Sequence, residues 1–362
     1  MAAPTMVYVD PAGAADSGTG TIGDPYLDLQ YALNTQTRDA TNGDQFNIKA
    51  GTDEILAAAL SLATYGTPTV AAPVVFRGYT SAANDGGIGG ISGNNSVAIQ
   101  ATGSFTNFVD MHLHNCGAAV IVTLSTGMLV NCELNNTSGN AVAGVTNIFG
   151  CKIHDIGGVG IAATGGHWYF NFLKNGAKTF TTAISTTSTG IAIGFNIISI
   201  GGSSSGINLL QSGTFILNNS IYSAGGTGTG IINPNNAARN ISIINNIIEG
   251  FSGAGGKGIS IVTGPMTLYA NNKYYNNATH ENITGNLTID LLNNSVLSAS
   301  AFASPSTDNF MVDTSIKAGA YPTSFKGSIT NQFLDVGAAQ REEAASGGGL
   351  IRHPGMAGGL NG

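Results

Sequence analysis

A five-residue frame that recurs along the chain constrains the fold more than any other feature of this sequence. Each copy ends on an apolar residue, and most copies carry asparagine at the centre, as in LNNSI at 217–221, INNII at 244–248 and LNNSV at 292–296. The closing apolar positions are Leu113, Leu134, Ile153, Leu173, Ile198, Ile221, Ile248, Tyr274 and Val296. They lie 19 to 27 residues apart, which is too irregular for leucine-rich or ankyrin repeats but suits a solenoid with loops of variable length.

The central position of the frame forms a column of its own. Its residues are Met111, Cys132, Cys151, Asn171, Asn196, Asn219, Asn246, Asn272 and Asn294. Residues two apart in a strand face the same side, so the column should lie inside the molecule, beside the closing apolar residue. Stacked coils place equivalent residues about 4.8 Å apart, so each asparagine can hydrogen-bond the next. We therefore predict a buried asparagine ladder from Asn171 to Asn294, with the cysteines as small buried members of the same column.

Short glycine-led apolar stretches complete each predicted coil, at 158–162, 190–193, 206–209, 230–232 and 258–262. Glycine supplies the positive φ that a sharp corner needs, and the Ile and Val that follow can stack as interior rows. Charged residues make up only 9% of the chain, against about 25% in a typical soluble domain, and small polar residues replace them. The sequence therefore predicts an all-β chain that folds as a single parallel β-helix.

With these features and its two ends, the chain resembles the right-handed parallel β-helix proteins of the pectate-lyase-like superfamily. The segments VYVDPAG at 7–13, DPY at 24–26 and NIKAGT at 47–52 resemble the N-terminal cap of that group. FLDVGAAQ at 333–340 resembles its usual terminal segment. The resemblance covers about residues 7–340 and implies the fold, but the fold hosts lyases, hydrolases, adhesins and phage spikes alike.

We divide the chain into an N-terminal cap at 1–45, the β-helix at 46–299, an irregular C-terminal cap at 300–343 and a Gly-rich tail at 344–362. Asp24 is a good N-cap and Pro25 suits the first helical position, so we expect a capping helix over 24–36. The apolar positions with helical spacing in that segment are Leu29, Ala32 and Leu33. Phe46, Ile48 and Ala50 alternate as the first strand, and 74–79 and 88–91 are typical of further early strands.

The strongest candidate for chemistry is a group of polar residues on three successive frames. The group comprises Asp110, His112, His114, Glu133, Asn135, Lys152 and His154. Alternation places them on the outward face, where the repeat register stacks His112 with Glu133 and Lys152, and His114 with Asn135 and His154. Imidazoles beside carboxylates can bind zinc or a similar ion, so His112, His114, Glu133 and His154 are candidate metal ligands. The alternative, which we favour, is a solvated ladder of compatible polar side chains without a metal or cofactor.

The sequence also bears on catalysis. The NTD, DD, GHG and RIK motifs typical of polygalacturonase-like enzymes of this fold are absent, and the chain has only five arginines. We therefore predict no catalytic residue, and the sequence favours a non-enzymatic role. The aromatic cluster at 167–172 could stack on a sugar, although packing or a subunit contact is the simpler interpretation.

Charge and hydropathy restrict the partners. The net charge of −7 disfavours a nucleic-acid binder, and no apolar run approaches the roughly 18 residues that cross a bilayer. The first residues lack the basic start and apolar core of a secretion signal. By analogy with signal-less β-helix proteins of phages, we predict a virion structural protein: a spike, fibre or capsid-decorating subunit that forms a homotrimer and presents its surface to a host or glycan.

In that interpretation the tail attaches to other virion proteins. Its candidate attachment residues are Leu350, Ile351, Arg352, His353 and Pro354. Two alternatives remain open. One is a polysaccharide lyase or glycoside hydrolase that acts on surface glycans, and the other is a bacterial surface adhesin.

Overall fold

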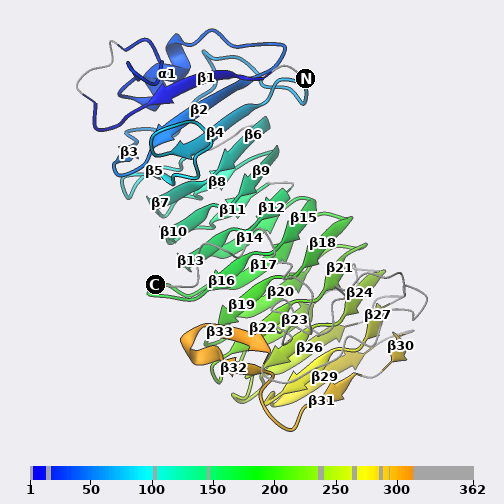
Figure 1. Ribbon diagram of the computed structural model, residues 1–362. Helices are drawn as coiled ribbons and strands as arrows, with labels where there is room; N and C mark the ends of the chain where they lie inside the picture. The colour runs from blue at the N-terminus through cyan, green and yellow to red at the C-terminus, as the bar shows by residue number, and fades with distance from the viewer. Residues whose placement is uncertain are drawn as a thin grey trace, which may run out of the picture. The chain divides into compact units, whose positions relative to one another are not determined.

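The computed structural model describes residues 3–13, 18–100, 104–144, 147–234, 240–262, 267–284, 288–292 and 294–312. Its strands are short and pair in parallel, except for one antiparallel hairpin near the end of this range. Figure 1 shows the strands following one another as coils of a right-handed parallel β-helix. The predicted fold class is therefore confirmed. In the described part of the chain, no helix has the length and apolar character needed to cross a membrane.

Contacts divide the chain into two compact units. Unit 1 holds residues 1–164 and 176–178, and unit 2 holds residues 165–175 and 179–362. From residue 104 to residue 284, each coil contributes one strand to each of three parallel sheets, which we call sheets 1, 2 and 3 in the order in which the chain visits them. The predicted division into two caps, a β-helix and a tail stays a prediction.

Unit 1 carries the first strands of each sheet. Sheet 1 here contains β1 (Thr5–Val9), β2 (Asp44–Lys49), β4 (Val74–Tyr79), β6 (Ser104–Val109), β9 (Thr126–Val130) and β12 (Asn147–Phe149). Sheet 2 contains β3 (Asp53–Ile55), β5 (Gly89–Ser92), β7 (Met111–Gly117), β10 (Glu133–Thr137) and β13 (Lys152–Ile156). Sheet 3 contains β8 (Val122–Thr123), β11 (Val142–Ala143) and β14 (Val159–Ala163).

Unit 2 continues the same pattern. Sheet 1 here contains β15 (Gly166–Tyr169), β18 (Ile191–Gly194), β21 (Phe215–Leu217), β24 (Ile241–Ile244), β27 (Thr267–Ala270) and β30 (Thr288–Leu292). Sheet 2 contains β16 (Phe172–Lys174), β19 (Ile197–Ile200), β22 (Ser220–Ser223), β25 (Ile247–Glu249), β28 (Lys273–Tyr275) and β31 (Ser295–Val296). Sheet 3 contains β17 (Thr182–Thr186), β20 (Ser205–Leu209), β23 (Thr229–Asn233), β26 (Lys257–Val262) and β29 (Thr279–Thr284).

The asparagine ladder runs through unit 2 as predicted. From Asn171 to Asn294, the side-chain amide of each ladder asparagine donates to Oδ1 of the next, at 3.0–3.1 Å. The same Oδ1 atoms accept the backbone N–H groups of the preceding ladder residues, at 2.8–3.1 Å. The ladder therefore satisfies both side-chain and main-chain groups where the chain bends between sheets 1 and 2.

The residue before each ladder position makes this bend with a left-handed backbone. Positive φ values of 52° to 61° occur at Asp110, Asn131, Phe170, Phe195, Asn218, Asn245 and Asn271. Asparagine and aspartate tolerate this conformation better than other residues with a side chain. This explains why so many frames read Asn-Asn: the first asparagine turns the chain and the second joins the ladder.

One of the five glycine-led stretches lies in a different sheet from the other four, although we expected all five to form one equivalent strand of each coil. Four of the five belong to sheet 3, where Ile161, Ile207, Ile231 and Ile259 are fully buried. The stretch at 190–193 instead forms β18 in sheet 1, and β17 supplies the sheet 3 strand of the preceding coil. A glycine turn followed by isoleucine occurs at more than one corner of a coil, so the local pattern did not identify the sheet.

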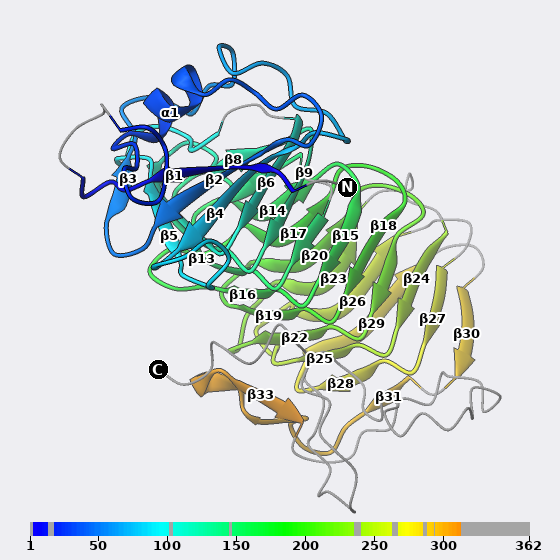
Figure 2. The same ribbon diagram turned by 45° about the horizontal axis from the view of Figure 1, so that its top comes forward.

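The N-terminal helix is present but shorter than predicted. Helix α1 covers Leu29–Thr35, and Asp28 rather than Asp24 is the N-cap, with its Oδ1 accepting the Tyr31 N–H at 2.6 Å. Tyr26 exchanges backbone hydrogen bonds with Tyr8 and Asp10, which keeps the segment before Asp28 extended. The apolar residues expected to face the core, Leu29, Ala32 and Leu33, are all buried. Figures 1 and 2 both show α1 next to β1.

Strand β1 precedes the strand that we expected to be first. The predicted strand at Phe46 and Ile48 is confirmed as β2, and both side chains are fully buried. It pairs in parallel with β1 on one side and with β4 on the other. The early strands predicted at 74–79 and 88–91 are also present, as β4 and β5.

The described part of the predicted C-terminal cap is a hairpin of β32 (Phe302–Ser304), the short 3₁₀ helix η1 (Pro305–Thr307) and β33 (Asn309–Val312). Instead of lying over the last coil, it packs on the outward side of sheet 2, where Phe302 and Phe310 bury against Ile247. Both ribbon views place it beside β22. The rest of that cap and the tail, including residues 350–354, lie outside the described residues.

Candidate functional site

The predicted polar columns exist on the outward face of sheet 2 in unit 1. The strand register pairs Glu133 with His112 and with Lys152, and Asn135 with His114 and with His154. Asp110 does not share this face, because it lies at the left-handed bend before β7. It accepts a hydrogen bond from Asn131 and pairs with Arg77 across 3.6 Å. The other six residues form the centre of the candidate site.

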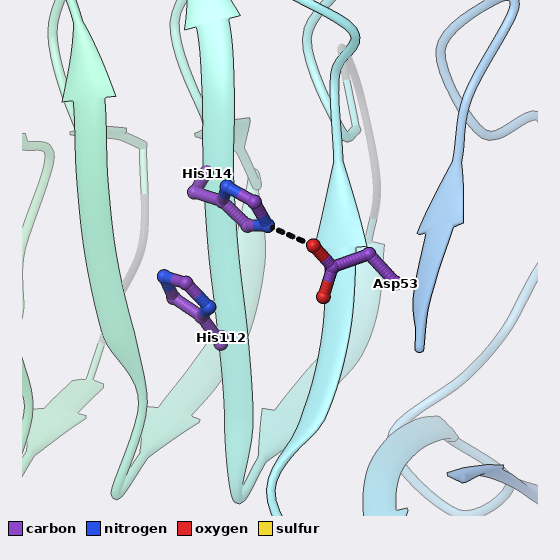
Figure 3. A group of neighbouring side chains, drawn as sticks. All are labelled: Asp53, His112 and His114. Atoms are coloured by element: carbon purple, nitrogen blue, oxygen red, sulfur yellow. Dashed lines mark hydrogen bonds and ion pairs between the residues drawn. The ribbon is translucent and has the colours of Figure 1, made fainter. Parts of the chain in front are cut away.

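His112 and His114 form a compact group with a residue that we did not anticipate, Asp53 of β3. One ligand atom from each of the three residues lies within 4.8 Å of the others. The two imidazole rings are parallel, with centroids 4.1 Å apart, and Nε2 of His114 lies 2.9 Å from Oδ2 of Asp53. Figure 3 shows the carboxylate pointing from its own strand toward both rings. We call this group the Asp53 cluster.

Gly90 makes room for the Asp53 cluster. Strand β5 lies between β3 and β7, and Gly90 pairs with Asp53 on one side and with His112 on the other. A Cβ atom at Gly90 would lie 1.8 Å from Oδ1 of Asp53, far inside van der Waals contact. Because Gly90 has no side chain, Asp53 can extend over β5 and reach the histidines.

A second group on the same face surrounds His154, and we call it the His154 group. Nε2 of His154 lies 2.8 Å from Oε1 of Glu133, and its Nδ1 lies 2.7 Å from Oδ2 of Asp155. Lys152 donates to Oε1 of Glu133 at 2.9 Å. The side chains of His154 and Glu133 are 18% and 35% exposed, so the group is partly enclosed but remains accessible to a ligand. An imidazole between two carboxylates is well placed to hold a proton on each nitrogen.

The pKa values of His154 and His112 are shifted in opposite directions. The hydrogen bond to Glu133 is the largest effect on His154, and together with Asp155 it raises the pKa of this imidazole despite its burial. The bond from His154 is in turn the main reason why the pKa of the Glu133 carboxyl falls to about 2. Burial, followed by the charge of His114, lowers the pKa of His112. One face of the sheet therefore carries a readily protonated imidazole and one that is harder to protonate.

Asn135 connects the two groups. Its amide nitrogen lies 3.2 Å from Nε2 of His112 and 3.3 Å from Nε2 of His154. Backbone N–H groups of Ala177 and Lys178, in the loop that follows β16, donate to Oδ1 of Asp155 and hold its carboxylate in place. The face is thus a continuous hydrogen-bonded surface that extends across β3, β5, β7, β10 and β13.

Unit 2 carries a separate aromatic strip where sheet 1 bends into sheet 2. Its members are His167, Tyr169, Phe170 and Phe195, whose rings follow one another at centroid separations of 5.2 to 6.3 Å. Phe170 and Phe195 stack on each other at 5.2 Å, and both have φ near +60°, in the column where other coils place asparagine, aspartate or glycine. Left-handed backbone at a bulky residue is unfavourable, so these two phenylalanines occupy a strained position.

Unit 2 also has a hollow of about 540 Å³ between the hairpin and the outward face of β22, β25 and β28. Glu249 lines it but is 1% exposed, and burial raises its pKa. Its two oxygens accept hydrogen bonds from the Ser300 hydroxyl at 2.7 Å and the Ala301 N–H at 3.0 Å. Both carboxylate oxygens are therefore used to hold the segment that leads into the hairpin.

Sequence reasoning found the histidines and Glu133 but missed Asp53, Gly90 and Asp155. Asp155 follows His154 directly, and an acidic neighbour of a candidate histidine was a usable signal. Asp53 had no such signal, because β3 and β5 lack the asparagine frame that set the register of later coils. All three cysteines are buried, and Cys132 and Cys151 are the two that belong to the predicted interior column.

Comparisons with known proteins give neighbours in structure but none in sequence. No family model and no curated protein matches the chain. Among solved structures, it is similar to pectate lyase Pel9A, with a TM-score of 0.48 and 15% identity over 94% of this chain and 98% of that one. It is also similar to a GH87 α-1,3-glucanase from Streptomyces thermodiastaticus, with a TM-score of 0.44 and 12% identity over 83% of this chain and 72% of that one.

A third similar structure is a GH136 lacto-N-biosidase from Eubacterium ramulus, with a TM-score of 0.41 and 11% identity over 80% of this chain and 67% of that one. The parallel sheets and the asparagine ladder of the chain itself confirm its resemblance to the pectate-lyase-like β-helix proteins as a resemblance in fold. A shared fold does not transfer an activity, so function has to be argued from the sites.

Proposed function

We propose that this protein cleaves a polysaccharide that it binds along the outward face of its sheets. The observation that carries the proposal is His154, an imidazole held between Glu133 and Asp155 with its pKa raised. This reverses our preference for a non-enzymatic role and takes up the glycan-cleaving alternative.

The proposed chemistry is acid-assisted hydrolysis of a glycosidic bond: His154 protonates the departing oxygen as its bond to the anomeric carbon breaks, and a water molecule adds to that carbon and releases a proton. Asp155 orients the imidazole and helps raise its pKa, so His154 holds a proton more readily than an ordinary imidazole and is placed to donate it. Glu133 remains ionised beside it, where it can stabilise positive charge that develops on the sugar during cleavage. A glycosidic oxygen that approaches Glu133 comes within reach of the Nε2 proton. Two neighbouring groups whose pKa values are shifted in opposite directions are the usual mark of an acid and its anionic partner.

The form of the surface also suits a glycan. Acidic side chains on this face lie beside Lys152 and His154, so donors and acceptors alternate without a strong net charge. Such a surface complements hydroxyl groups better than it complements a highly charged polymer. Independently, the aromatic strip of unit 2 offers partly exposed rings, which suit the apolar faces of sugars.

The test is glycan cleavage by the full chain. We expect wild-type protein to release reducing ends from at least one member of a panel of neutral and acidic polysaccharides. His154→Gln should lower that rate by at least about 100-fold, the usual contribution of a general acid. His280→Gln is the matched control, because His280 belongs to β29 of unit 2, outside the His154 group and the aromatic strip, and the rate should not change.

Two results would contradict the proposal. One is a folded wild-type protein that cleaves no glycan in the panel, and the other is a His154→Gln variant as active as wild type. New reducing ends without the absorbance of an unsaturated product would support hydrolysis, whereas an unsaturated product would identify a lyase and contradict the role given to Glu133. The virion role, the homotrimer and the adhesin alternative stay predictions, because no feature among the described residues bears on them.

A further inference from the structure

We propose that Asp53, His112 and His114 bind a divalent transition-metal ion of the zinc class. The site stands apart from the His154 group in its ligands and does not depend on the proposed cleavage reaction. Of the four ligands that the sequence suggested, the site keeps His112 and His114, and it adds Asp53. It also leaves out Glu133 and His154, which bond to each other instead.

The distances are close to those that an ion requires. Zinc binds histidine nitrogen and carboxylate oxygen at about 2.0–2.2 Å, which places two ligand atoms of a tetrahedral site roughly 3.3 Å apart. Nε2 of His114 and Oδ2 of Asp53 are 2.9 Å apart, and the third ligand atom lies within 4.8 Å of both. Because the two imidazole rings are parallel, binding would require them to turn so that a nitrogen of each points, with the Asp53 carboxylate, at one ion.

One ring nitrogen of His112 remains to bind an ion, and it lies on the side of Asp53. Its Nε2 lies next to Asn135 on the β10 side, which leaves Nδ1 for an ion. Figure 3 shows one ring nitrogen of His112 on the side of Asp53 and the other directed away. The Asn135 amide can then turn its oxygen toward the Nε2 proton, and such an outer partner typically fixes the orientation of a metal-bound histidine.

The ligand types select the class of ion. Two imidazoles and one carboxylate suit zinc and neighbouring transition metals, whereas calcium and magnesium prefer sites built from oxygen alone. Three protein ligands leave a further position for water, the arrangement of zinc sites that are open to a substrate. The Asp53 side chain is 39% exposed, so the open position faces solvent, while the His114 side chain is 9% exposed and firmly held.

Gly90 gives an independent reason to regard the cluster as a built site. Asp53 crosses an intervening strand to reach the histidines, and it can do so because that strand has glycine at the crossing point. Glycine inside a strand weakens it, and a frequent reason for its presence is the close approach of another group. Here that group is a carboxylate directed at two imidazoles.

The experiment measures metal binding by the full-length protein after treatment with a chelator. Titration with Zn²⁺ alone, followed by calorimetry, should show one ion per chain. Co²⁺ should give the visible absorption bands of a site with nitrogen and oxygen ligands. Asp53→Asn keeps the size of the side chain but removes its charge, and we expect it to weaken Zn²⁺ binding at least tenfold. His112→Asn should do the same.

Gly90→Ala tests whether Asp53 needs the space left by Gly90 to reach the histidines, and it changes no ligand. Its methyl group would displace Asp53, so we expect weaker Zn²⁺ binding and altered Co²⁺ bands in a protein whose circular dichroism is unchanged. His167→Gln, outside the cluster, should bind as wild type does. The proposal is wrong if wild-type protein takes up no Zn²⁺ in a one-to-one ratio, or if Asp53→Asn and His112→Asn both bind as tightly as wild type. Neither result depends on glycan cleavage, so the two proposals can fail separately.

Discussion

At the scale of single residues, the structure shows how a small set of side chains holds the coils together. Asn219 is representative: its Oδ1 accepts both the backbone and side-chain N–H groups of Asn196, and its amide donates to Oδ1 of Asn246 and to the carbonyl of Ile193. All of these groups are buried, so each bond protects a polar atom that water cannot reach.

Replacing Asn219 by alanine should therefore be costly. The change leaves several buried donors and acceptors without partners, at about 1–3 kcal/mol for each one that cannot find a new partner. We expect the free energy of unfolding to fall by about 3 kcal/mol or more in urea denaturation. Asn34→Ala, at an exposed position of α1, is the control and should change it by less than about 0.5 kcal/mol. A similar small loss for Asn219→Ala would show that the ladder contributes little.

The stability contributed by His154 should depend on pH. Its pKa is raised in the folded protein, because Glu133 and Asp155 face it and outweigh Lys152 and the effect of burial. The protonated form is therefore favoured by folding. Its stabilising effect should be complete below the unfolded value of 6.5 and should disappear as the pH rises through the higher folded value.

His154→Gln removes this contribution, so the variant should lose about 1–3 kcal/mol relative to wild type at pH 6 and less at pH 9. Urea denaturation across this range provides the measurement. Asp155→Asn removes one of the two carboxylates and should reduce the pH-dependent part in the same direction. A difference between wild type and His154→Gln that grows with pH would contradict the assignment.

At the scale of elements, the bend between sheets 1 and 2 decides what each coil presents to solvent. Most bends use asparagine, aspartate or glycine for the left-handed residue, which costs little. The two bends that use Phe170 and Phe195 place stacked rings on the surface of unit 2. Strain retained at a surface position is a reason to suspect a binding role.

Phe195→Asn separates stability from binding at this bend. Asparagine relieves the backbone strain but loses ring stacking, and both effects are of order 1 kcal/mol, so we expect little net change in the free energy of unfolding. Affinity for the glycan substrate should nevertheless fall several-fold. Phe215→Asn is the control: Phe215 is a 50% exposed phenylalanine of β21 in the same unit, outside the positive-φ positions. If the two variants bind glycan equally well, the strip has no part in recognition.

At the scale of the whole molecule, the same coil is repeated along the chain, and the two proposed sites of unit 1 lie where the repeat is broken. The Asp53 cluster depends on a glycine in β5 and on a strand, β3, that lacks the asparagine frame. The His154 group lies in coils whose interior column holds cysteine instead of asparagine. The activity of this chain has to be decided by its own side chains, because a shared fold does not transfer a function.

The sequence by itself determined the parallel β-helix, the ladder and the register of β7, β10 and β13, because a strand repeats every two residues and each coil carries the same frame. It also identified His112, His114, Glu133 and His154. It did not place Asp53 beside the histidines, since the two lie about 60 residues apart and meet only because Gly90 leaves a gap between them. Nor did it show that Glu133 and His154 bind each other and not an ion. Those contacts depend on how side chains lean across neighbouring strands, and tertiary structure alone decides that.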